Sequence, residues 1–220
     1  MVPCGEGSKS LQTTEEILTE MLGYGFSRKD CVVAVGGGVV GDLGGFVASL
    51  YMRGIDFYNV PTTVLSQVDS SIGGKTAVNL AGIKNIIGAF YQPKAVLIDP
   101  DTLNSLSERQ IVNGLIEAIK MGATSDKELF DLFLNDDWRK HLDLIIEKAL
   151  LVKKYVVEQD EKESHLRKIL NFGHTIGHGF ESAAHGRYLH GECVALGIPP
   201  MCEEGTVRQE VCRVLSNVGL

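Results

Sequence analysis

The sequence predicts two structurally different parts, an α/β part over residues 1–100 and an all-α part over residues 101–220. The first part alternates short β-branched runs with helical stretches and glycine loops. The second has few such runs and long amphipathic periods, for example Ile111, Leu115 and Ile119. We place the boundary at Asp99-Pro100-Asp101 and expect a ligand site in the cleft between the parts.

The elements of the first part follow from local patterns. Thr13-Thr14-Glu15-Glu16 has the form of a capping box, so a helix is expected there, ending at Gly23. The apolar run Cys31–Val35 predicts a parallel strand covered on both faces. The stretch from Cys31 to Met52 carries Asp42 and several glycines, so it predicts a buried strand, a turn and a helix rather than a membrane span. Further strands are expected at Tyr58–Val60 and Ala95–Ile98.

The composition excludes several classes of protein. With 220 residues, 44% of them hydrophobic and 22% charged, the chain has an ordinary globular composition. A net charge of -7 argues against a nucleic-acid partner. The five cysteines are scattered without a C-x-x-C pair, and residues 1–10 do not resemble a signal peptide. We therefore expect a cytoplasmic protein that does not associate with membranes.

A glycine motif follows the first predicted strand. Gly36-Gly37-Gly38-Val39-Val40-Gly41-Asp42 satisfies G-x-G-x-x-G at the start of a predicted helix, which favours a pyrophosphate-bearing cofactor. The alternative is that the glycines only allow a tight turn and close helix packing. The acidic residue that usually binds the ribose is not clearly placed, and Asp56 is a poor candidate.

A second glycine-rich segment contains Gly74-Lys75-Thr76. A P-loop is excluded, because Asp69 stands where its first glycine is required. The segment is either a polar turn or, with Lys75, Lys84 and Asn85, a basic pocket for a phosphate-bearing ligand.

Histidines cluster near the end of the chain. His174 and His178 are four residues apart and share a helix face, which fits either a metal site or a hydrogen-bonded pair. Gly173 and Gly177 weaken a helix, so they imply the close approach of another backbone or of a ligand. His190 follows in the segment Leu189-His190-Gly191-Glu192.

Charged residues upstream of the cluster are less informative by themselves. Glu117 lies in an apolar helical stretch, where it is either a surface partner of Lys120 or a further metal ligand. Lys153, Asp160, Glu163 and Arg167 are expected to occupy one long helical region, and their charges alone assign them no role.

Taken together, these motifs resemble those of the 3-dehydroquinate synthase family. The resemblance covers nearly the whole chain, and the motifs occur in the same order. The segments that carry the resemblance are 36–42, Met52-Arg53-Gly54, Pro61-Thr62-Thr63, 69–76, Lys84-Asn85, Ile116-Glu117-Ala118-Ile119-Lys120, 171–178 and 189–192. The resemblance implies a dehydroquinate synthase-like fold, with a Rossmann-like NAD-binding part followed by a helical metal-binding part. It also implies a shikimate-pathway enzyme that converts 3-deoxy-D-arabino-heptulosonate 7-phosphate to 3-dehydroquinate and phosphate, as a homodimer with NAD and zinc or cobalt.

The same resemblance implies roles for individual residues. The metal ligands would be Glu117, His174 and His190, which moves His178 from the metal to the substrate. The NAD site would comprise Glu6, Lys9, Gly38, Val39, Val40, Gly41, Asp42, Thr62, Thr63, Lys75, Lys84, Thr102, Leu103, Asn104 and Ser105. The substrate site would comprise Asp69, Lys75, Asn85, Lys120, Lys153, Glu163, Arg167, Asn171 and His178, with Arg53 reaching the phosphate held by a neighbouring subunit.

The sequence departs from the family pattern in a few places. Gln110 replaces a common glutamate and Ser105 a usual threonine. Family members begin upstream of Gly5-Glu6 and continue beyond Leu220, so we expect the chain to be a fragment. Two alternatives stay open: another sugar phosphate cyclase or a metal-dependent polyol dehydrogenase, and a catalytically silent chain that retains only the fold and subunit contacts.

Overall fold

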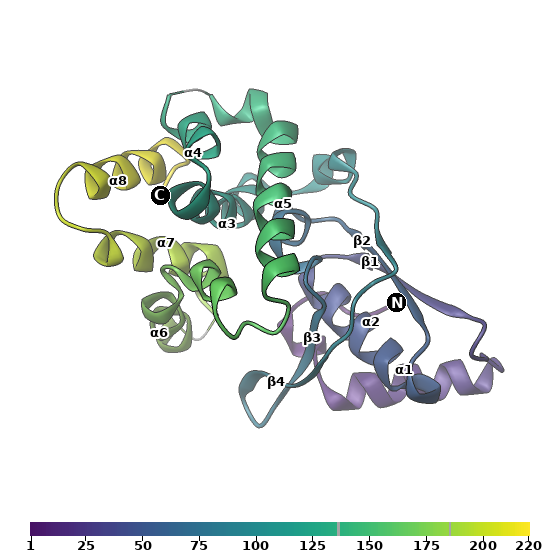
Figure 1. Cartoon of the computed structure of the whole chain (residues 1–220). Coiled ribbons are helices and arrows are strands. Elements are labelled where there is room, and N and C mark those ends of the chain that lie inside the picture. Colours follow the sequence, from purple (N-terminus) through teal and green to yellow (C-terminus); the bar gives the residue numbers. More distant parts are fainter. Residues whose placement is uncertain (136, 185) are drawn as a thin grey trace. The chain divides into compact units, whose positions relative to one another are not determined.

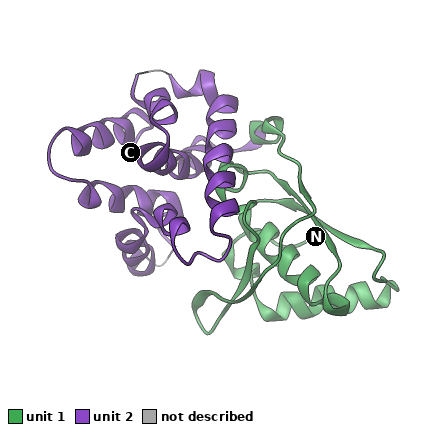
Figure 2. Ribbon diagram, in the orientation of Figure 1, with its two compact units in different colours: residues 1–104 green, residues 105–220 purple. Residues whose placement is uncertain are grey.

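The computed structural model describes residues 1–135, 137–184 and 186–220 (Figure 1). The chain divides into two compact units, Met1–Asn104 and Ser105–Leu220 (Figure 2). Unit 1 contains helices and strands, whereas the described part of unit 2 contains helices and no strand. Within the described ranges, no helix is long and apolar enough to cross a membrane.

Unit 1 combines a small parallel sheet with a hairpin and two helices. Its elements are α1 (Leu11–Gly23), β1 (Cys31–Gly36), α2 (Gly38–Leu50), β2 (Asp56–Pro61), β3 (Lys75–Leu80), β4 (Ile83–Phe90) and β5 (Ala95–Val96). The predicted strand, turn and helix over 31–52 are confirmed, and so is the strand around Tyr58. The strand predicted at 95–98 is shorter than expected.

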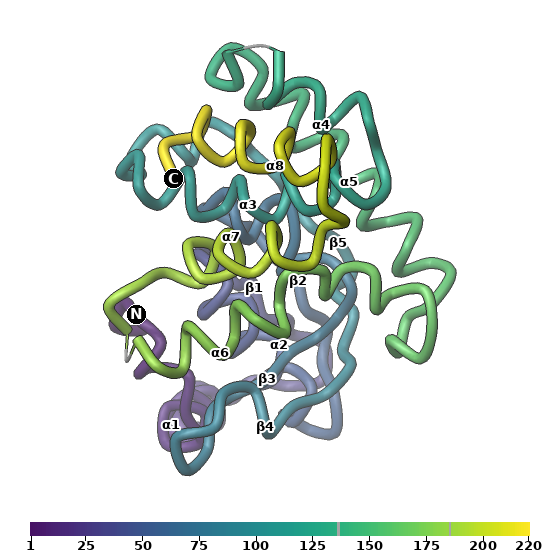
Figure 3. Tube along the Cα trace, turned by 90° about the vertical axis from the view of Figure 1, so that its left-hand side faces the viewer, coloured from purple at the N-terminus to yellow at the C-terminus, as the bar shows by residue number. Residues whose placement is uncertain are grey.

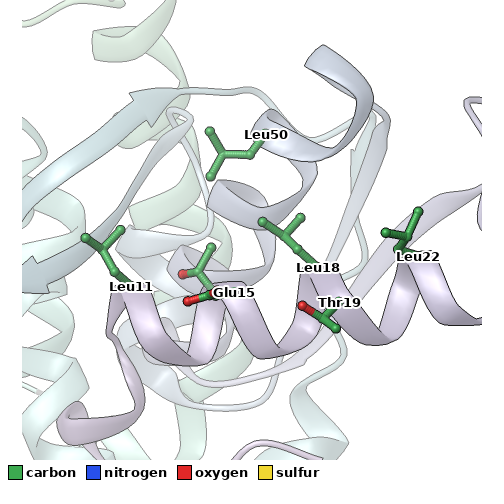
Figure 4. A pocket seen from close by; sticks show the side chains of 7 residues that line it. Leu11, Glu15, Leu18, Thr19, Leu22 and Leu50 are labelled. Carbon is green, nitrogen blue, oxygen red and sulfur yellow. The ribbon is translucent and has the colours of Figure 1, made fainter.

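Helix α1 begins earlier than the sequence pattern indicated. The side chain of Ser10, which has an extended backbone, accepts a hydrogen bond from the N–H of Thr13 at 3.1 Å. Ser10 is therefore the N-cap, and the capping box predicted at Thr13 is wrong. Leu11, Leu18 and Leu22 of α1 line an apolar pocket together with Leu50 of α2 (Figure 4).

The parallel sheet has the strand order β1-β2-β5. Helix α2 packs against one face of it, where Ala34 and Phe57 are buried with Phe46 of α2. The opposite face includes Val33 and Val35, whose side chains are 53% and 61% exposed. The prediction of a strand covered on both faces is therefore wrong for this chain, because alternate residues of β1 point away from α2.

Strands β3 and β4 form an antiparallel hairpin that the sequence analysis did not predict. Ala81 and Gly82 connect the strands, with φ of 52° and 80°. Two successive left-handed residues are typical of the two-residue turns that match the twist of a hairpin. Residues 73–76 lead into this hairpin, so Lys75 opens a strand rather than a helix, in agreement with the exclusion of a P-loop.

Unit 2 is built around α3, which is buried along most of its length. The helices are α3 (Glu108–Ser125), α4 (Lys127–Leu134), α5 (Leu142–Gln159), α6 (His174–Ala184), α7 (His190–Met201) and α8 (Thr206–Asn217). Helices α6 and α7 run side by side, and α7 also packs against α3 (Figure 3). This arrangement brings together the helices that carry Glu117, His174 and His190.

Candidate metal and nucleotide sites

Glu117 lies in the middle of α3 and is completely buried. Its Oε2 accepts a hydrogen bond from the ammonium group of Lys120, which is also buried. Its Oε1 has no hydrogen-bond partner among the described residues. A surface ion pair is therefore ruled out for Glu117, and a bound cation would satisfy the remaining buried oxygen.

Two histidines present the same ring nitrogen to Glu117. His174 opens α6, and its Nδ1 lies 3.2 Å from the carbonyl oxygen of Phe172. His190 opens α7, and its Nδ1 lies 3.1 Å from Oε2 of Glu181. A carbonyl or carboxylate oxygen accepts but does not donate, so we assign the proton of each neutral ring to Nδ1 and the lone pair to Nε2.

The two Nε2 atoms converge on Oε1 of Glu117, at 3.5 Å for His174 and 3.4 Å for His190. Ligand atoms about 2.0–2.2 Å from a tetrahedral zinc-like ion lie about 3.3–3.6 Å from one another. Both distances therefore have the length of an edge of such a site, and the nitrogens of the two histidines lie within 4.8 Å of each other. A fourth position would be left for a substrate or water. Two imidazoles and a carboxylate are a donor set that zinc and cobalt accept.

The electrostatics of these side chains favour a cation. Burial raises the pKa of Glu117, but Lys120 and the two imidazoles outweigh burial and hold the pKa well below its usual range. Burial lowers the pKa of His190, but Glu117 and Glu181 outweigh it and raise the pKa to about 9. Burial also lowers the pKa of His174, and because Glu117 opposes this only in part, the pKa lies below its ordinary value. A metal ion and a proton would therefore compete for Nε2 of His190.

His178 lies one turn after His174 on α6 and is exposed. Its ring centroid is 5.3 Å from that of His174 and 5.8 Å from that of His190. The three imidazoles have ligand nitrogens within 4.8 Å of one another, a looser grouping than the contacts made by Glu117. His178 thus lies beside the three converging atoms, on a side open to solvent.

Glycines allow α6 and α7 to approach closely. A Cβ atom on Gly177 would lie 3.0 Å from the backbone oxygen of Cys193, and one on Gly173 would lie 2.6 Å from a side-chain carbon of Ile198. A Cβ atom on Gly197 would lie 2.0 Å from the backbone oxygen of Gly173. The prediction that Gly173 and Gly177 mark the close approach of another backbone is confirmed, and that backbone is α7.

A row of polar contacts joins α3 to the start of α7. The guanidinium of Arg109 donates to both carboxylate oxygens of Glu192, at 2.6 and 2.8 Å. One turn later, Oδ1 of Asn113 accepts the N–H of Gly191 at 2.7 Å. Glu117 follows after another turn. These contacts align α7 with α3 next to the histidines. They were not predicted from the sequence, because single charged or amide residues on a helix give no sign of their partners.

Asp160 shapes the segment after α5. Burial raises the pKa of Asp160, but backbone N–H groups of His165, Arg167 and Ser164 donate to its carboxylate and hold the pKa below its usual range. These contacts turn the chain out of the helix, so the single long helical region predicted over Lys153–Arg167 is wrong. Lys153 lies buried on α5, whereas Glu163 lies in the loop beyond it.

The remaining substrate residues expected in unit 2 follow this loop. Arg167 is buried in the short helical segment Leu166–Asn171. The amide of Asn171 donates to Oε1 of Glu163 at 2.7 Å. The structure therefore brings Glu163 and Asn171 into contact.

In unit 1, the loops that follow β1 and β2 pack together at one edge of the parallel sheet. The N–H of Thr62 donates to the carbonyl oxygen of Gly36 at 2.9 Å. A Cβ atom on Gly37 would lie 3.0 Å from the methyl carbon of Thr63, and α2 begins at Gly38 without a side-chain cap. Close packing explains part of the glycine motif, while the uncapped helix start suits an anionic group.

Gln67 links this edge to the segment after β5. It is completely buried, and its Nε2 donates to the backbone oxygens of Pro61 and Asp99 and to the hydroxyl of Thr102. Thr102, the first residue of the expected nucleotide segment, is thereby held near Pro61, the residue before Thr62. Asp56 instead opens β2, at the opposite edge of the sheet, which disfavours it as a ribose ligand.

Lys9 and Asp42 form a largely buried ion pair in unit 1, with side chains that are 5% and 18% exposed. Nζ of Lys9 lies 2.7 Å from Oδ2 of Asp42 and 3.5 Å from Oε1 of Glu6. Burial raises the pKa of Asp42 to about 6, even though Lys9 lowers it. The pair joins two segments that the resemblance assigned to NAD.

We expect Lys9→Met to destabilise the protein more at pH 8 than at pH 5. The folded pKa of Asp42 lies above its ordinary value of 3.8, so its contribution to stability decreases as pH rises from about 4 through 6. Without Lys9 this pKa rises further, and keeping an unpaired buried carboxylate ionised at pH 8 destabilises by about 3–5 kcal/mol. Urea denaturation at the two pH values measures the difference.

Lys29→Met, at an exposed position, is the control and should change the free energy of unfolding by no more than about 0.5 kcal/mol. An equal loss at both pH values for Lys9→Met would contradict the buried pair.

Three expected substrate residues have a left-handed backbone. Arg53, Asn85 and Glu163 have φ of 69°, 55° and 61°. This conformation is unfavourable by about 1–2 kcal/mol for a residue with a side chain, and such strain is common at functional sites. Asn85 and Lys84 lie on β4, Lys75 opens β3, and Asp69 lies in the helical turn Ser66–Ser70.

Comparisons with known proteins cover most of the chain. The 3-dehydroquinate synthase N-terminal family model matches residues 1–113, and the C-terminal model matches residues 114–211. A 3-dehydroquinate synthase of Thermoanaerobacter pseudethanolicus is 50% identical over 213 residues, covering 92% of this chain and 59% of the relative. One of Dictyoglomus thermophilum is 52% identical over 204 residues, covering 90% and 58%. The chain thus spans about 59% of the length of the first of these relatives.

Solved structures agree with this assignment. A 2-epi-5-epi-valiolone synthase from Streptomyces hygroscopicus subsp. jinggangensis, with NAD⁺ and Zn²⁺ bound, has a TM-score of 0.90 and 29% identity, covering 99% of this chain and 65% of the other. A 2-deoxy-scyllo-inosose synthase complexed with carbaglucose-6-phosphate, NAD⁺ and Co²⁺ has a TM-score of 0.87 and 31% identity, covering 98% and 63%. The predicted dehydroquinate synthase-like fold is therefore confirmed, and the chain belongs to the 3-dehydroquinate synthase family.

Proposed function

We propose that the protein acts as a 3-dehydroquinate synthase, converting 3-deoxy-D-arabino-heptulosonate 7-phosphate to 3-dehydroquinate and phosphate. The observation that carries the proposal is the convergence of Glu117, His174 and His190, whose facing atoms are 3.4–3.5 Å apart at a buried, unsatisfied carboxylate oxygen. Relatives that are 50–52% identical bear this activity in their names.

Glu117, His174 and His190 would hold a divalent zinc or cobalt ion. An ion there supplies Lewis-acid chemistry, polarising a substrate hydroxyl. Neighbouring groups prepare these ligands for the ion. Lys120 neutralises one carboxylate oxygen of Glu117. The acceptor oxygens of Phe172 and Glu181 hold the Nδ1 protons, so the Nε2 lone pairs of His174 and His190 stay available to the ion.

The edge of the parallel sheet in unit 1 would hold NAD, which supplies a reversible hydride acceptor. The start of α2 offers backbone amides to the pyrophosphate, and the three glycines before it let the cofactor approach. Gln67 would keep the segments at Thr62 and Thr102 in place around the cofactor. The other residues proposed for this site are Glu6, Lys9, Gly38, Val39, Val40, Gly41, Asp42, Thr63, Lys75, Lys84, Leu103, Asn104 and Ser105.

The charged side chains suit a substrate with a carboxylate and a phosphate. We assign Lys153 and Arg167 to the carboxylate, because charge-assisted hydrogen bonds from buried cations orient such a group. We assign Lys75, Asn85 and Arg53 to the phosphate. Asp69, Lys120, Glu163, Asn171 and His178 complete the proposed substrate set.

The likeness to the valiolone and inosose synthases makes another sugar phosphate cyclase the second candidate. Its support is weaker, because those proteins are 29–31% identical, against 50–52% for the 3-dehydroquinate synthases. The dehydrogenase-like neighbours, at about 15% identity, support only the shared fold.

Phosphate release tests the proposal directly. The 220-residue protein, supplied with NAD and Zn²⁺ or Co²⁺, should release phosphate from the heptulosonate phosphate and form 3-dehydroquinate without net NADH. Glucose 6-phosphate, the natural counterpart of carbaglucose 6-phosphate, is the competing substrate. Preferential release from glucose 6-phosphate would favour an inosose synthase, and no release by a metal-loaded protein would favour a silent chain.

Two further parts of the proposal concern the state of the protein. We propose a homodimer, which sedimentation equilibrium would distinguish from a monomer.

We also propose a cytoplasmic location, supported by five cysteines that are all free, two of them buried. Loss of native thiols in the protein isolated from its source would contradict the second point.

A further inference from the structure

We propose that Glu181 is a positioning residue that holds His190 with Nε2 directed at the metal position. The proposal rests on the metal centre of the proposed function and is independent of the substrate. Glu181 lies between the segments 171–178 and 189–192 that carry the family resemblance, and belongs to neither.

The contact between Glu181 and His190 determines which ring nitrogen is free. Oε2 of Glu181 lies 3.1 Å from Nδ1 of His190, and the carboxylate side chain is only 15% exposed. An ionised carboxylate accepts without donating, so the contact places the proton on Nδ1. A ring flipped by about 180° would direct a carbon edge at Glu117 instead of Nε2, and would lose the hydrogen bond.

The close packing of α6 and α7 fixes the position of Glu181 relative to His190. Glu181 lies one turn after Gly177 on α6, where the missing side chain lets α6 pack on Cys193 of α7. The start of α7 is held from the other side by Asn113 and Arg109 of α3. The ring of His190 thus contacts a carboxylate on α6, while the two residues that follow it on α7 are held by α3. Glu181 orients the ring, and α3 fixes the backbone that carries it.

The two histidines differ in how they are oriented. His174 faces the neutral carbonyl oxygen of Phe172, whereas His190 faces a carboxylate. A carboxylate partner makes the imidazole a stronger ligand, and loss of such a partner typically lowers metal affinity about 10–100-fold. We therefore expect the effect of Glu181 to appear in metal binding itself.

Cobalt titration of the apoprotein tests the proposal without turnover. Glu181→Ala should lower the affinity for Co²⁺ by about 10–100-fold and alter the visible absorption spectrum of the bound ion. Glu181→Gln retains an acceptor oxygen for Nδ1, so it should recover part of the affinity. Ser182→Ala, at an exposed neighbouring position on α6, is the matched control and should bind Co²⁺ as the unmodified protein does.

The outcomes separate this inference from the proposed function. Unchanged affinity and spectrum in a folded Glu181→Ala protein would overturn the positioning role and leave the metal centre standing. If Glu181→Ala does not fold, Glu181→Met decides, because methionine keeps the length of the side chain but offers no oxygen to Nδ1 of His190. Unaltered affinity and spectrum in that variant would overturn the positioning role. Failure of the unmodified protein to bind Co²⁺ would overturn both this inference and the proposed metal centre.

Discussion

Glu117→Gln is expected to lose Co²⁺ or Zn²⁺ binding by more than about 100-fold, beyond the range for residues that only orient a ligand. The substitution keeps the size of the side chain but removes the charge at the point where Nε2 of His174 and His190 converge. Lewis-acid stabilisation is worth several kcal/mol, so turnover should fall by about 10³-fold or more. Metal analysis after dialysis, together with phosphate release, measures both effects.

The same substitution should destabilise the metal-free protein. Lys120 is buried and would lose the carboxylate that accepts its hydrogen bond, a loss worth about 3–5 kcal/mol for a buried pair. Adding Lys120→Met should restore part of the stability without restoring metal binding. Glu108→Gln, at an exposed position on the same helix, is the control for metal content. Stoichiometric metal in Glu117→Gln would contradict the proposed ligand set.

Gly197→Ala is expected to destabilise unit 2 by about 3 kcal/mol or more. The new Cβ atom would lie 2.0 Å from the backbone oxygen of Gly173 and 2.9 Å from the backbone nitrogen of Gly177. Backbone atoms cannot rotate away as a side chain can, so α6 and α7 would have to separate, and overpacking of this kind commonly destabilises by 1–3 kcal/mol or more. Urea denaturation measures the loss.

Metal binding should fall in the same variant, because His174 and His190 open the two helices that separate. Gly179→Ala is the matched control on α6, where a Cβ atom meets nothing within 4 Å. That change should leave metal binding intact and stabilise the helix by up to about 1 kcal/mol. Equal effects of Gly179→Ala and Gly197→Ala would show that helix propensity, rather than packing, governs these positions.

Elements with strong local patterns were predicted well from the sequence. The apolar strand at Cys31, the helix after Gly37 and the amphipathic helix around Glu117 are present as expected. Hydrophobic periodicity reports on each such element by itself. The glycines were also interpreted correctly: Gly177 lies inside α6 and Gly173 just before it, and both face the closely packed α7.

Elements that depend on distant or capping contacts were not predicted. The hairpin of β3 and β4 was missed because each strand is stabilised by its partner rather than by a distinctive pattern of its own. The end of α5 was missed because the carboxylate of Asp160 takes up backbone N–H groups of residues that follow it. Helix α1 begins at Leu11 instead of near Thr13, because the side chain of Ser10 caps it. The two glutamates after Thr14 had suggested a later cap.

The sequence by itself determined the family of the protein, the order of most of its helices and strands, and the residue types available for metal, nucleotide and substrate. The tertiary structure alone decided that Oε1 of Glu117 meets Nε2 of His174 and His190 at 3.4–3.5 Å. It alone revealed that Glu181, Asn113 and Arg109 hold His190 and its helix in place. The physical reason is that ligand geometry arises from the packing of α3, α6 and α7, and the local periodicity of a sequence does not encode the distance between helices.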